Sequence, residues 1–220
     1  MAEQNEGAEK SALITPELEE QLKGVLARLQ KPVTVVSVCD DGEKSREMAV
    51  FLKHLTGLSS QLTLELLAPG TDPREKELDG SLLPATGCWN DAGFCRGVFH
   101  GVPGGHELSS FVTCILAAGQ GAAPLDKPTL KDIARLTHPV TLQICVSLGC
   151  QHCAKLVMSA QRIAAENPNV TAHMVDANLY PQLVAQYKIE RVPVVAAGGK
   201  VIGVGGMTLP ELCTLLRKQR

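Results

Sequence analysis

The sequence predicts an α/β protein built from a duplicated β-α-β unit. Short apolar runs rich in β-branched residues alternate with helical patterns along the 220 residues, and this alternation is typical of α/β folds. The two halves of the chain also match each other: KPVT at 31–34 corresponds to HPVT at 138–141, an offset of 107 residues. By the following helix the offset is 108, which sets GEKS at 42–45 opposite CQHC at 150–153. We therefore expect one chemically silent copy and one that carries two cysteines; a chance match between two similar strand-helix patterns is the alternative.

The composition narrows the class of protein. Hydrophobic residues make up 45% and charged residues 20%, as in an ordinary globular core. The net charge is −2 without a basic run, so electrostatics favours neither a nucleic-acid partner nor an anionic membrane. Apolar runs fall well short of the roughly 20 residues that span a bilayer. The polar start MAEQNEGAEKSA lacks the pattern of a signal peptide, and we expect a cytoplasmic protein with a flexible tail at 1–12.

The first half opens with a helix at 15–29, where Thr15 is suited to the N-cap and Pro16 to the first helical position. Between its later elements, the turn-forming segment 68–81 is expected to be a loop. The other elements expected here are strands at 31–38, 61–67, 82–89 and 95–101, and helices at 43–55 and 104–119.

The segment QGAAPLDKP at 120–128 is the clearest boundary, because its glycine and prolines stop one helix before the next begins. We divide the chain into the tail, a first fold at 13–122, a linker at 123–128 and a second fold at 129–220. In the second fold a hairpin should turn at Gly198-Gly199, and Thr208 with Glu211 forms a capping box. The other elements expected are strands at 138–148 and 169–176, and helices at 129–136, 153–166, 179–189 and 208–220.

Cys150 and Cys153 are the chemically informative pair. A strand leads through a short turn into this C-x-x-C, which opens a helix. Unpaired N–H groups and the macrodipole at a helix start favour negative charge, and so lower the pKa of a thiol placed there. Cys153, one turn further in, is placed to close a disulfide with Cys150. His152 between them offers a donor and a positive charge, or is simply a solvated residue.

A zinc site is the competing interpretation of this pair. It needs four ligands, usually as two separated pairs, and a second C-x-x-C is absent from the sequence. Cys145, His138 and His173 are available, but Cys145 lies within a strand. We therefore expect no bound metal. Of the eight cysteines, we expect Cys114, Cys145 and Cys213 to be small buried residues, while Cys39, Cys88 and Cys95 have no assigned role.

Pro193 stands between apolar β-formers in ERVPVV, an unusual place because proline does not donate to a sheet ladder. A cis Val192-Pro193 bond beside the dithiol explains it, with the backbone of Val192 free to pair with an extended partner segment. An ordinary trans proline at a strand start is the alternative.

Together these residues resemble a known family. A strand, a C-x-x-C helix, a "VP" and a glycine-turned hairpin resemble the thioredoxin/glutaredoxin fold. The closer resemblance is to the N-terminal domain of the alkyl hydroperoxide reductase flavoprotein subunit, over about residues 13–217. The similar segments are LARLQKPVTVVSVCDDGEKS, VFHGVPGGHELSSFVTCIL, VSLGCQHC, ERVPVV and MTLPEL. The resemblance implies two fused thioredoxin-like folds, each a mixed sheet flanked by helices, with only the second redox-active.

The family also implies a function. A dithiol shuttle takes electrons from a pyridine-nucleotide-dependent flavoprotein reductase and passes them to a peroxiredoxin. By position, Cys150 is then the attacking thiol, Cys153 the resolving thiol and Pro193 the cis-proline. Glu107 in GGHELSS matches a glutamate of the silent fold. By analogy with double-fold disulfide oxidoreductases it is a proton acceptor near the dithiol, and a solvated glutamate in the first turn of a helix is the alternative. The resemblance implies that the redox group is a reversible Cys150–Cys153 disulfide and that no cofactor is bound.

Two departures from the family's pattern affect this expectation. The sequence ends at Arg220 and lacks a dinucleotide-binding glycine fingerprint, so we expect the flavoprotein to be a separate protein, unless the sequence is a piece of a longer chain. Gln-His stands between the cysteines where the family has His-Asn, which leaves the redox potential open. A general protein disulfide oxidoreductase or isomerase, and a non-catalytic binding module with a metal at the C-x-x-C, are the alternative functions.

Overall fold

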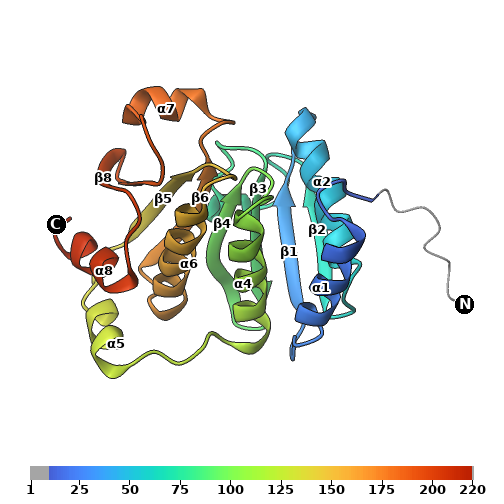
Figure 1. Ribbon diagram of the computed structural model, residues 1–220, viewed down its shortest axis with the longest axis horizontal. Coiled ribbons are helices and arrows are strands. Elements are labelled where there is room, and N and C mark those ends of the chain that lie inside the picture. Colours follow the sequence, from blue (N-terminus) through green and yellow to red (C-terminus); the bar gives the residue numbers. More distant parts are fainter. Residues whose placement is uncertain (1–9, 220) are drawn as a thin grey trace, which may run out of the picture.

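The strands of the two halves form one continuous sheet in this computed structural model, which describes residues 10–219 (Figure 1). Within that range, the strands of the first half are Val33–Val38 (β1), Leu62–Leu67 (β2), Ala85–Asn90 (β3) and Gly93–His100 (β4). Those of the second half are Val140–Val146 (β5), Val170–Asp176 (β6), Val194–Ala197 (β7) and Lys200–Val204 (β8). Their order across the sheet is β2-β1-β3-β4-β6-β5-β7-β8.

The first and the last helix begin where the local sequence signals place them. Thr15 accepts a hydrogen bond from the N–H of Leu18 (3.3 Å) and caps the first helix, and Thr208 and Glu211 form the expected capping box of the last. The first four helices are Pro16–Leu26 (α1), Glu43–Thr56 (α2), Glu75–Leu78 (α3) and Glu107–Gln120 (α4). The other four are Lys127–Ala134 (α5), Gln151–Glu166 (α6), Pro181–Tyr187 (α7) and Leu209–Arg217 (α8).

The expected duplication is confirmed by the pairing of the strands. β1 runs parallel to β2 and antiparallel to β3, and β5 runs parallel to β6 and antiparallel to β7. Gly42 is the N-cap of α2 and Cys150 is the N-cap of α6, so the structure reproduces the offset of 108 residues seen in the sequence. The two halves therefore share one local architecture, but only the second has a pair of cysteines at the start of this helix.

The two halves meet where β4 pairs in parallel with β6, in the register Val98↔His173 and His100↔Val175. Above this seam α4 and α6 lie side by side, as Figure 1 shows. Parallel pairing aligns the carboxyl ends of strands at one edge of the sheet. The starts of α4 and α6 are therefore brought to the same edge although they are far apart in sequence.

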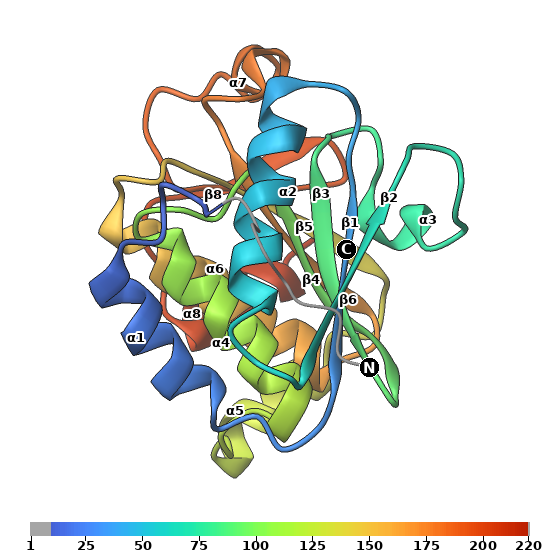
Figure 2. The ribbon, with the colours of Figure 1, turned by 90° about the vertical axis from the view of Figure 1, so that its right-hand side faces the viewer.

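Each face of the sheet is covered by a different set of helices. The largest apolar cluster lies under α1, α2, α4, α5, α6 and α8, and it includes Phe51, Phe111 and Ile144. The opposite face is covered by α3, which buries Leu78, and by α7, which packs Leu183 against Val175. Figure 2 shows α1, α2 and α4 on one side of the strands and α3 on the other. Within residues 10–219, none of the helices combines the length and apolar character that crossing a membrane requires.

The interpretation of 68–81 as a loop is wrong at α3, which forms a single helical turn there. The carboxylate of Asp72 accepts the N–H of Arg74 (2.9 Å) and starts the turn, and Leu78 is completely buried. One turn is too short to produce a periodic hydrophobic pattern, so tertiary burial decides its structure.

The predicted division into tail, folds and linker stays a prediction. Of the tail, residues 1–9 lie outside the described residues, while Ser11 is buried and its N–H donates to His54 Nδ1 (3.3 Å). At the linker, α5 already begins at Lys127, because Asp126 accepts the N–H of Thr129 (2.7 Å) as its N-cap.

Phe111 offers a test of the main core. Its ring packs edge-on against Phe99, with centroids 4.8 Å apart, and it is completely buried. We expect Phe111→Ala to lower the free energy of unfolding by about 3–5 kcal/mol, through lost transfer energy and a residual cavity. Leu130→Ala, at a position 37% exposed, should change it by less than about 0.5 kcal/mol. Urea unfolding of both variants measures this, and similar losses in the two would contradict the packing described.

Candidate active site

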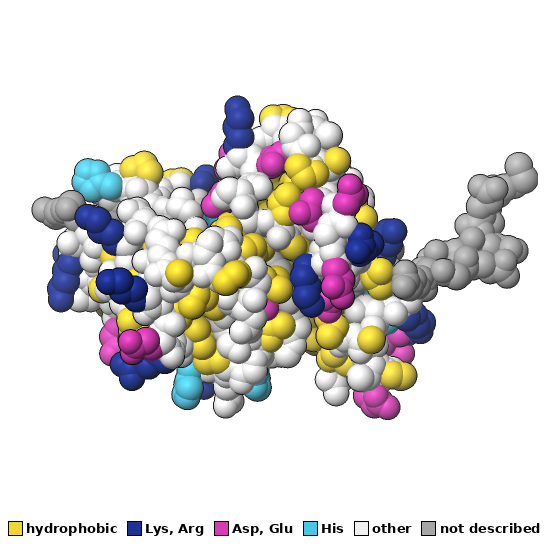
Figure 3. Space-filling model, turned by 90° about the horizontal axis from the view of Figure 1, so that it is seen from above, with side chains coloured by type: hydrophobic (Ala, Val, Ile, Leu, Met, Phe, Trp, Pro, Cys, Tyr) yellow, Lys and Arg dark blue, Asp and Glu magenta, His cyan; other side chains and the backbone are white. Residues whose placement is uncertain are grey.

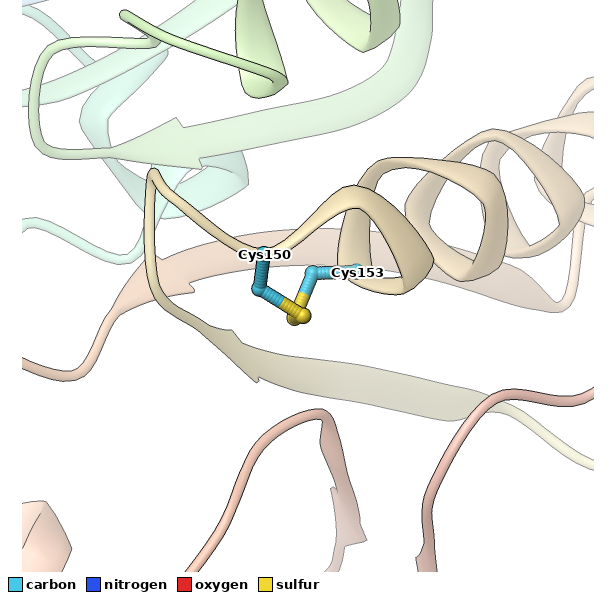
Figure 4. Close-up of a disulfide and its surroundings, with 2 residues drawn as sticks. All are labelled: Cys150 and Cys153. Atoms are coloured by element: carbon cyan, nitrogen blue, oxygen red, sulfur yellow. A yellow bond between two sulfur atoms is a disulfide. The ribbon is translucent and has the colours of Figure 1, made fainter.

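The C-x-x-C motif lies at the start of α6, where the chain leaves β5, and its two cysteines form a disulfide (Figure 4). Their Cα atoms are 5.4 Å apart. The turn is closed by backbone hydrogen bonds: the N–H of Cys150 donates to Ser147 (2.9 Å), and the N–H of Cys153 donates to Cys150 (3.1 Å). Cys150 is therefore held as the N-cap, where the unpaired N–H groups of the helix stabilise a thiolate.

The two sulfurs differ in exposure. Cys150 is half-buried, whereas Cys153 is completely buried and belongs to the main core. Thiol–disulfide exchange needs a nucleophile that a partner's sulfur can approach, and a second thiol shielded from other reactions. The predicted roles of attacking and resolving cysteine require such a difference in exposure, and they stay a prediction.

The bond between Val192 and Pro193 is cis, as the sequence analysis expected. The ladder of β7 begins only at Val194, which faces Cys145 of β5. Val192 therefore lies outside the ladder, partly exposed, beyond the same end of β5 from which the chain enters the dithiol turn. The carbonyl of Pro193 accepts the N–H of Gly205 (2.8 Å), and a Cβ on the next residue, Gly206, would lie 3.7 Å from that of His152.

The first half contributes the start of α4 to this site. The N–H of His106 donates to the carbonyl of Leu148 (3.0 Å), two residues before Cys150. Gly105 has a φ of +55°, and a Cβ there would lie 2.5 Å from the same carbonyl oxygen. Only glycine fits this close approach, so α4 is fixed against the dithiol loop.

Glu107, the first residue of α4, is completely buried. Its Oε2 accepts the hydroxyl of Ser110 (2.6 Å), while Oε1 has no hydrogen-bond partner among the described residues. Burial raises the pKa of this carboxyl to about 7, the hydroxyl of Ser110 opposes the rise, and the charge of Asp176 adds to it. A carboxyl with such a pKa exchanges protons near neutrality.

Asp176 is a residue that the sequence analysis missed. It ends β6 opposite Val146, is 5% exposed, and accepts the side-chain amide of Asn178 (3.0 Å). Burial raises its pKa, although the hydrogen bonds from Asn178 oppose the rise. The sequence held a signal for this residue, because a carboxylate stands at the end of an apolar strand. The ends of parallel strands meet at one edge of the sheet, so such a side chain lies at the same edge as the dithiol loop.

The other candidates are placed as follows. His152 is exposed on the first turn of α6, close to Gly206, where an added Cβ would lie 3.7 Å from its own. Six cysteines are free, and Cys114, Cys145 and Cys213 are buried as expected. Burial raises the pKa values of Cys145 and Cys213 to about 11 and that of Cys95 to about 12, and it also raises that of Cys39.

Comparison with known proteins places this geometry in a family. Residues 140–216 match the family model described as Thioredoxin domain. The chain is 34% identical to the NTD_N/C domain of alkylhydroperoxide reductase AhpF from Enterococcus faecalis (V583), with a TM-score of 0.85, over 92% of this chain and 99% of that domain. The chain belongs to the alkyl hydroperoxide reductase AhpF family.

Membership of the AhpF family confirms the expected pair of thioredoxin-like folds, the second of which carries Cys150 and Cys153. The AhpF relative from Pseudomonas putida is 32% identical over 89% of this chain, and the chain spans 36% of that relative's length. A protein disulfide oxidoreductase from Aeropyrum pernix K1 shares the fold, with a TM-score of 0.83 at 19% identity over 94% of this chain and 93% of that one.

Glu107 predicts a pH dependence of stability. Its folded pKa of about 7 lies above the ordinary value of 4.5, so the folded state holds the proton more tightly. The contribution of Glu107 to the free energy of unfolding is fully present below pH 4.5 and is lost as the pH rises through about 7. At about 1.4 kcal/mol per pKa unit, the loss is on the order of 3 kcal/mol.

We therefore expect the stability of the wild type relative to Glu107→Gln to fall between pH 5 and 8, measured by urea unfolding of the oxidised protein. Ser110→Ala removes the hydrogen bond that opposes the rise in pKa and should move the fall to higher pH. If the difference in stability between wild type and Glu107→Gln does not vary with pH, the description of Glu107 as a buried carboxyl with a raised pKa is contradicted.

Proposed function

We propose that the chain is a thiol–disulfide oxidoreductase that passes electrons from a pyridine-nucleotide-dependent flavoprotein reductase to a peroxiredoxin-type peroxidase. One observation carries the proposal: a half-buried Cys150 is bonded to a buried Cys153 at a helix start. The relatives named as alkyl hydroperoxide reductases supply the substrate class, since peroxide reduction needs a source of electrons.

The proposed cycle uses the two cysteines in turn. The thiolate of Cys150 attacks one sulfur of the peroxiredoxin's disulfide, and the partner's other sulfur leaves as a thiolate. Cys153 then loses its proton and attacks the sulfur of Cys150, which releases the partner with both cysteines reduced. The Cys150–Cys153 disulfide so formed accepts two electrons from the flavoprotein and takes up protons, which returns the dithiol.

Glu107 serves this cycle as a proton acceptor. Its pKa of about 7 lets it receive the proton that Cys153 must lose and return it to water at neutral pH. The link between His106 and Leu148 supports this role, because it fixes the start of α4 against the dithiol loop. His152, exposed beside Cys150, adds a donor at the mouth of the site.

The partner docks on the edge of the sheet around Cys150. Leu13 is 38% exposed there, and a Cβ on Gly104 would lie within 4 Å of both Leu13 and Leu148. Val192 and Met207 are partly exposed near Pro193 and Gly206. Seen from this end of the molecule, hydrophobic side chains gather over its middle and charged ones lie mostly toward its sides (Figure 3). We propose that an extended partner segment pairs with the backbone of Val192.

We also place the protein in the cytoplasm. In the described residues its cysteines outside the C-x-x-C are free thiols, as in proteins of reducing compartments.

Cysteine variants test the assignment of roles. We expect Cys150→Ser to abolish electron transfer from a flavoprotein reductase to a peroxiredoxin, followed by nicotinamide oxidation in the presence of peroxide. Cys153→Ser should leave a nucleophile without a resolving thiol, and so trap the peroxiredoxin as a mixed disulfide visible on a non-reducing gel. Cys213→Ser, which removes a free buried thiol, is the control and should retain activity. Turnover by Cys150→Ser would show that the site is misassigned.

A redox titration separates the proposal from its alternatives. Alkylation of free thiols in dithiothreitol buffers, read by mass spectrometry, should give a Cys150–Cys153 potential near or below that of thioredoxin, about −270 mV. A potential near −120 mV would instead favour a protein oxidase or isomerase. The absence of the disulfide at every potential would reject the redox function and leave the binding module.

A further inference from the structure

A second cluster of reactive side chains lies on the opposite face of the sheet from the dithiol helices. His100 ends β4 and His173 lies in β6, so the pair bridges the seam between the two halves. The two rings are stacked, with centroids 5.1 Å apart and planes inclined by 22°. Their exposed fractions are 0% and 2%. The proposed redox cycle makes no use of either histidine.

The hydrogen bonds of His100 determine which nitrogens carry protons. Its Nδ1 is 2.7 Å from the carbonyl oxygen of Leu82, and since a carbonyl only accepts, Nδ1 must donate. A neutral imidazole carries a single N–H. The Nε2 of His100 therefore has a lone pair, and it accepts Nδ1–H of His173 at 2.8 Å.

Asp79 brings a carboxylate to the same place. It follows α3 with a φ of 55° and is partly exposed. One ligand atom from each of Asp79, His100 and His173 lies within 4.8 Å of the other two. A cavity of 610 Å³ between α3 and α7 is lined by Asp79 and His173, so an ion has a route from solvent.

We propose that Asp79, His100 and His173 form a binding site for a divalent transition-metal ion of the Zn²⁺ type. Two imidazole nitrogens and one carboxylate oxygen are a ligand set that zinc accepts, with the fourth position left open. His100 already has the supporting contact typical of a metal ligand, because its other nitrogen donates to a carbonyl. That contact directs Nε2 of His100 toward Nδ1 of His173, the second proposed ligand atom.

Metal binding requires one small rearrangement. Tetrahedral zinc with Zn–N bonds of about 2.0–2.1 Å separates two nitrogens by about 3.3 Å, so the present 2.8 Å must open by about half an ångström. The proton on Nδ1 of His173 moves to Nε2, which frees Nδ1 to bind the ion without a change in net protonation. His173 lines the cavity, so water there can accept the new N–H.

The experiment uses the oxidised full chain, in which the disulfide removes Cys150 and Cys153 as competing zinc ligands. Equilibrium dialysis against Zn²⁺ with metal analysis gives the stoichiometry and Kd, and Co²⁺ reports coordination by its visible d–d absorption. We expect one equivalent to bind and the midpoint of thermal unfolding to rise with metal concentration, because the ion joins α3 to β6.

Two variants remove ligands while sparing the fold. Asp79→Asn keeps a residue that tolerates positive φ and an oxygen for the hydroxyl of Ser81, which now donates to Asp79 (2.6 Å). His173→Asn keeps an N–H donor for His100. Each should weaken Zn²⁺ binding at least about tenfold and abolish the cobalt spectrum. His138→Ala, which removes an exposed histidine, is the matched control and should bind as the wild type does.

The proposal is overturned if the oxidised wild type shows no saturable binding. It is equally overturned if Asp79→Asn binds with unchanged affinity. Should His173→Asn fail to fold, Asp79→Asn alone decides between these results.

Discussion

The parallel pairing of β4 with β6 is the contact on which the rest of the molecule depends. It makes one sheet out of two units that each have their own strands and helices, and it fixes their relative register through Val98↔His173 and His100↔Val175. Because of it, a helix of the first unit starts beside the dithiol loop of the second, where His106 bonds to Leu148. The silent copy thereby supplies Glu107, a buried carboxyl that joins Asp176 of the redox copy at this edge.

The chemistry of the site follows from differences in burial over a few residues. Cys150 is accessible because it caps a helix, and Cys153 is protected because the next turn enters the core. Burial raises the pKa of Glu107 to about 7 against the opposing hydrogen bond from Ser110, so its carboxyl is partly ionised near neutral pH. None of these features needs a bound cofactor to set it, since each arises from where the backbone ends a strand or begins a helix.

Local signals in the sequence were sufficient to predict several features of the fold and of the site. The capping box at Thr208, the turn at Gly198-Gly199 and the cis bond at Pro193 each depend on neighbouring residues, and each was predicted. The turn α3 was missed, because burial of Leu78 by distant strands stabilises it. Asp176 was missed although its place at the end of an apolar strand was a usable signal. The histidine pair was out of reach, because His100 and His173 are 73 residues apart and only the seam brings them together.

The six remaining thiols have a consequence for a protein proposed to work beside peroxides. Oxidation to sulfenic and higher acids begins from the thiolate, and a thiol with a pKa of about 11 or 12, such as Cys145, Cys213 or Cys95, is almost wholly protonated at neutral pH. Burial thus keeps these three thiols protonated and slows their oxidation. A chain with eight cysteines can in this way tolerate oxidants while leaving Cys150, half-buried at a helix start, open to attack by a partner's sulfur.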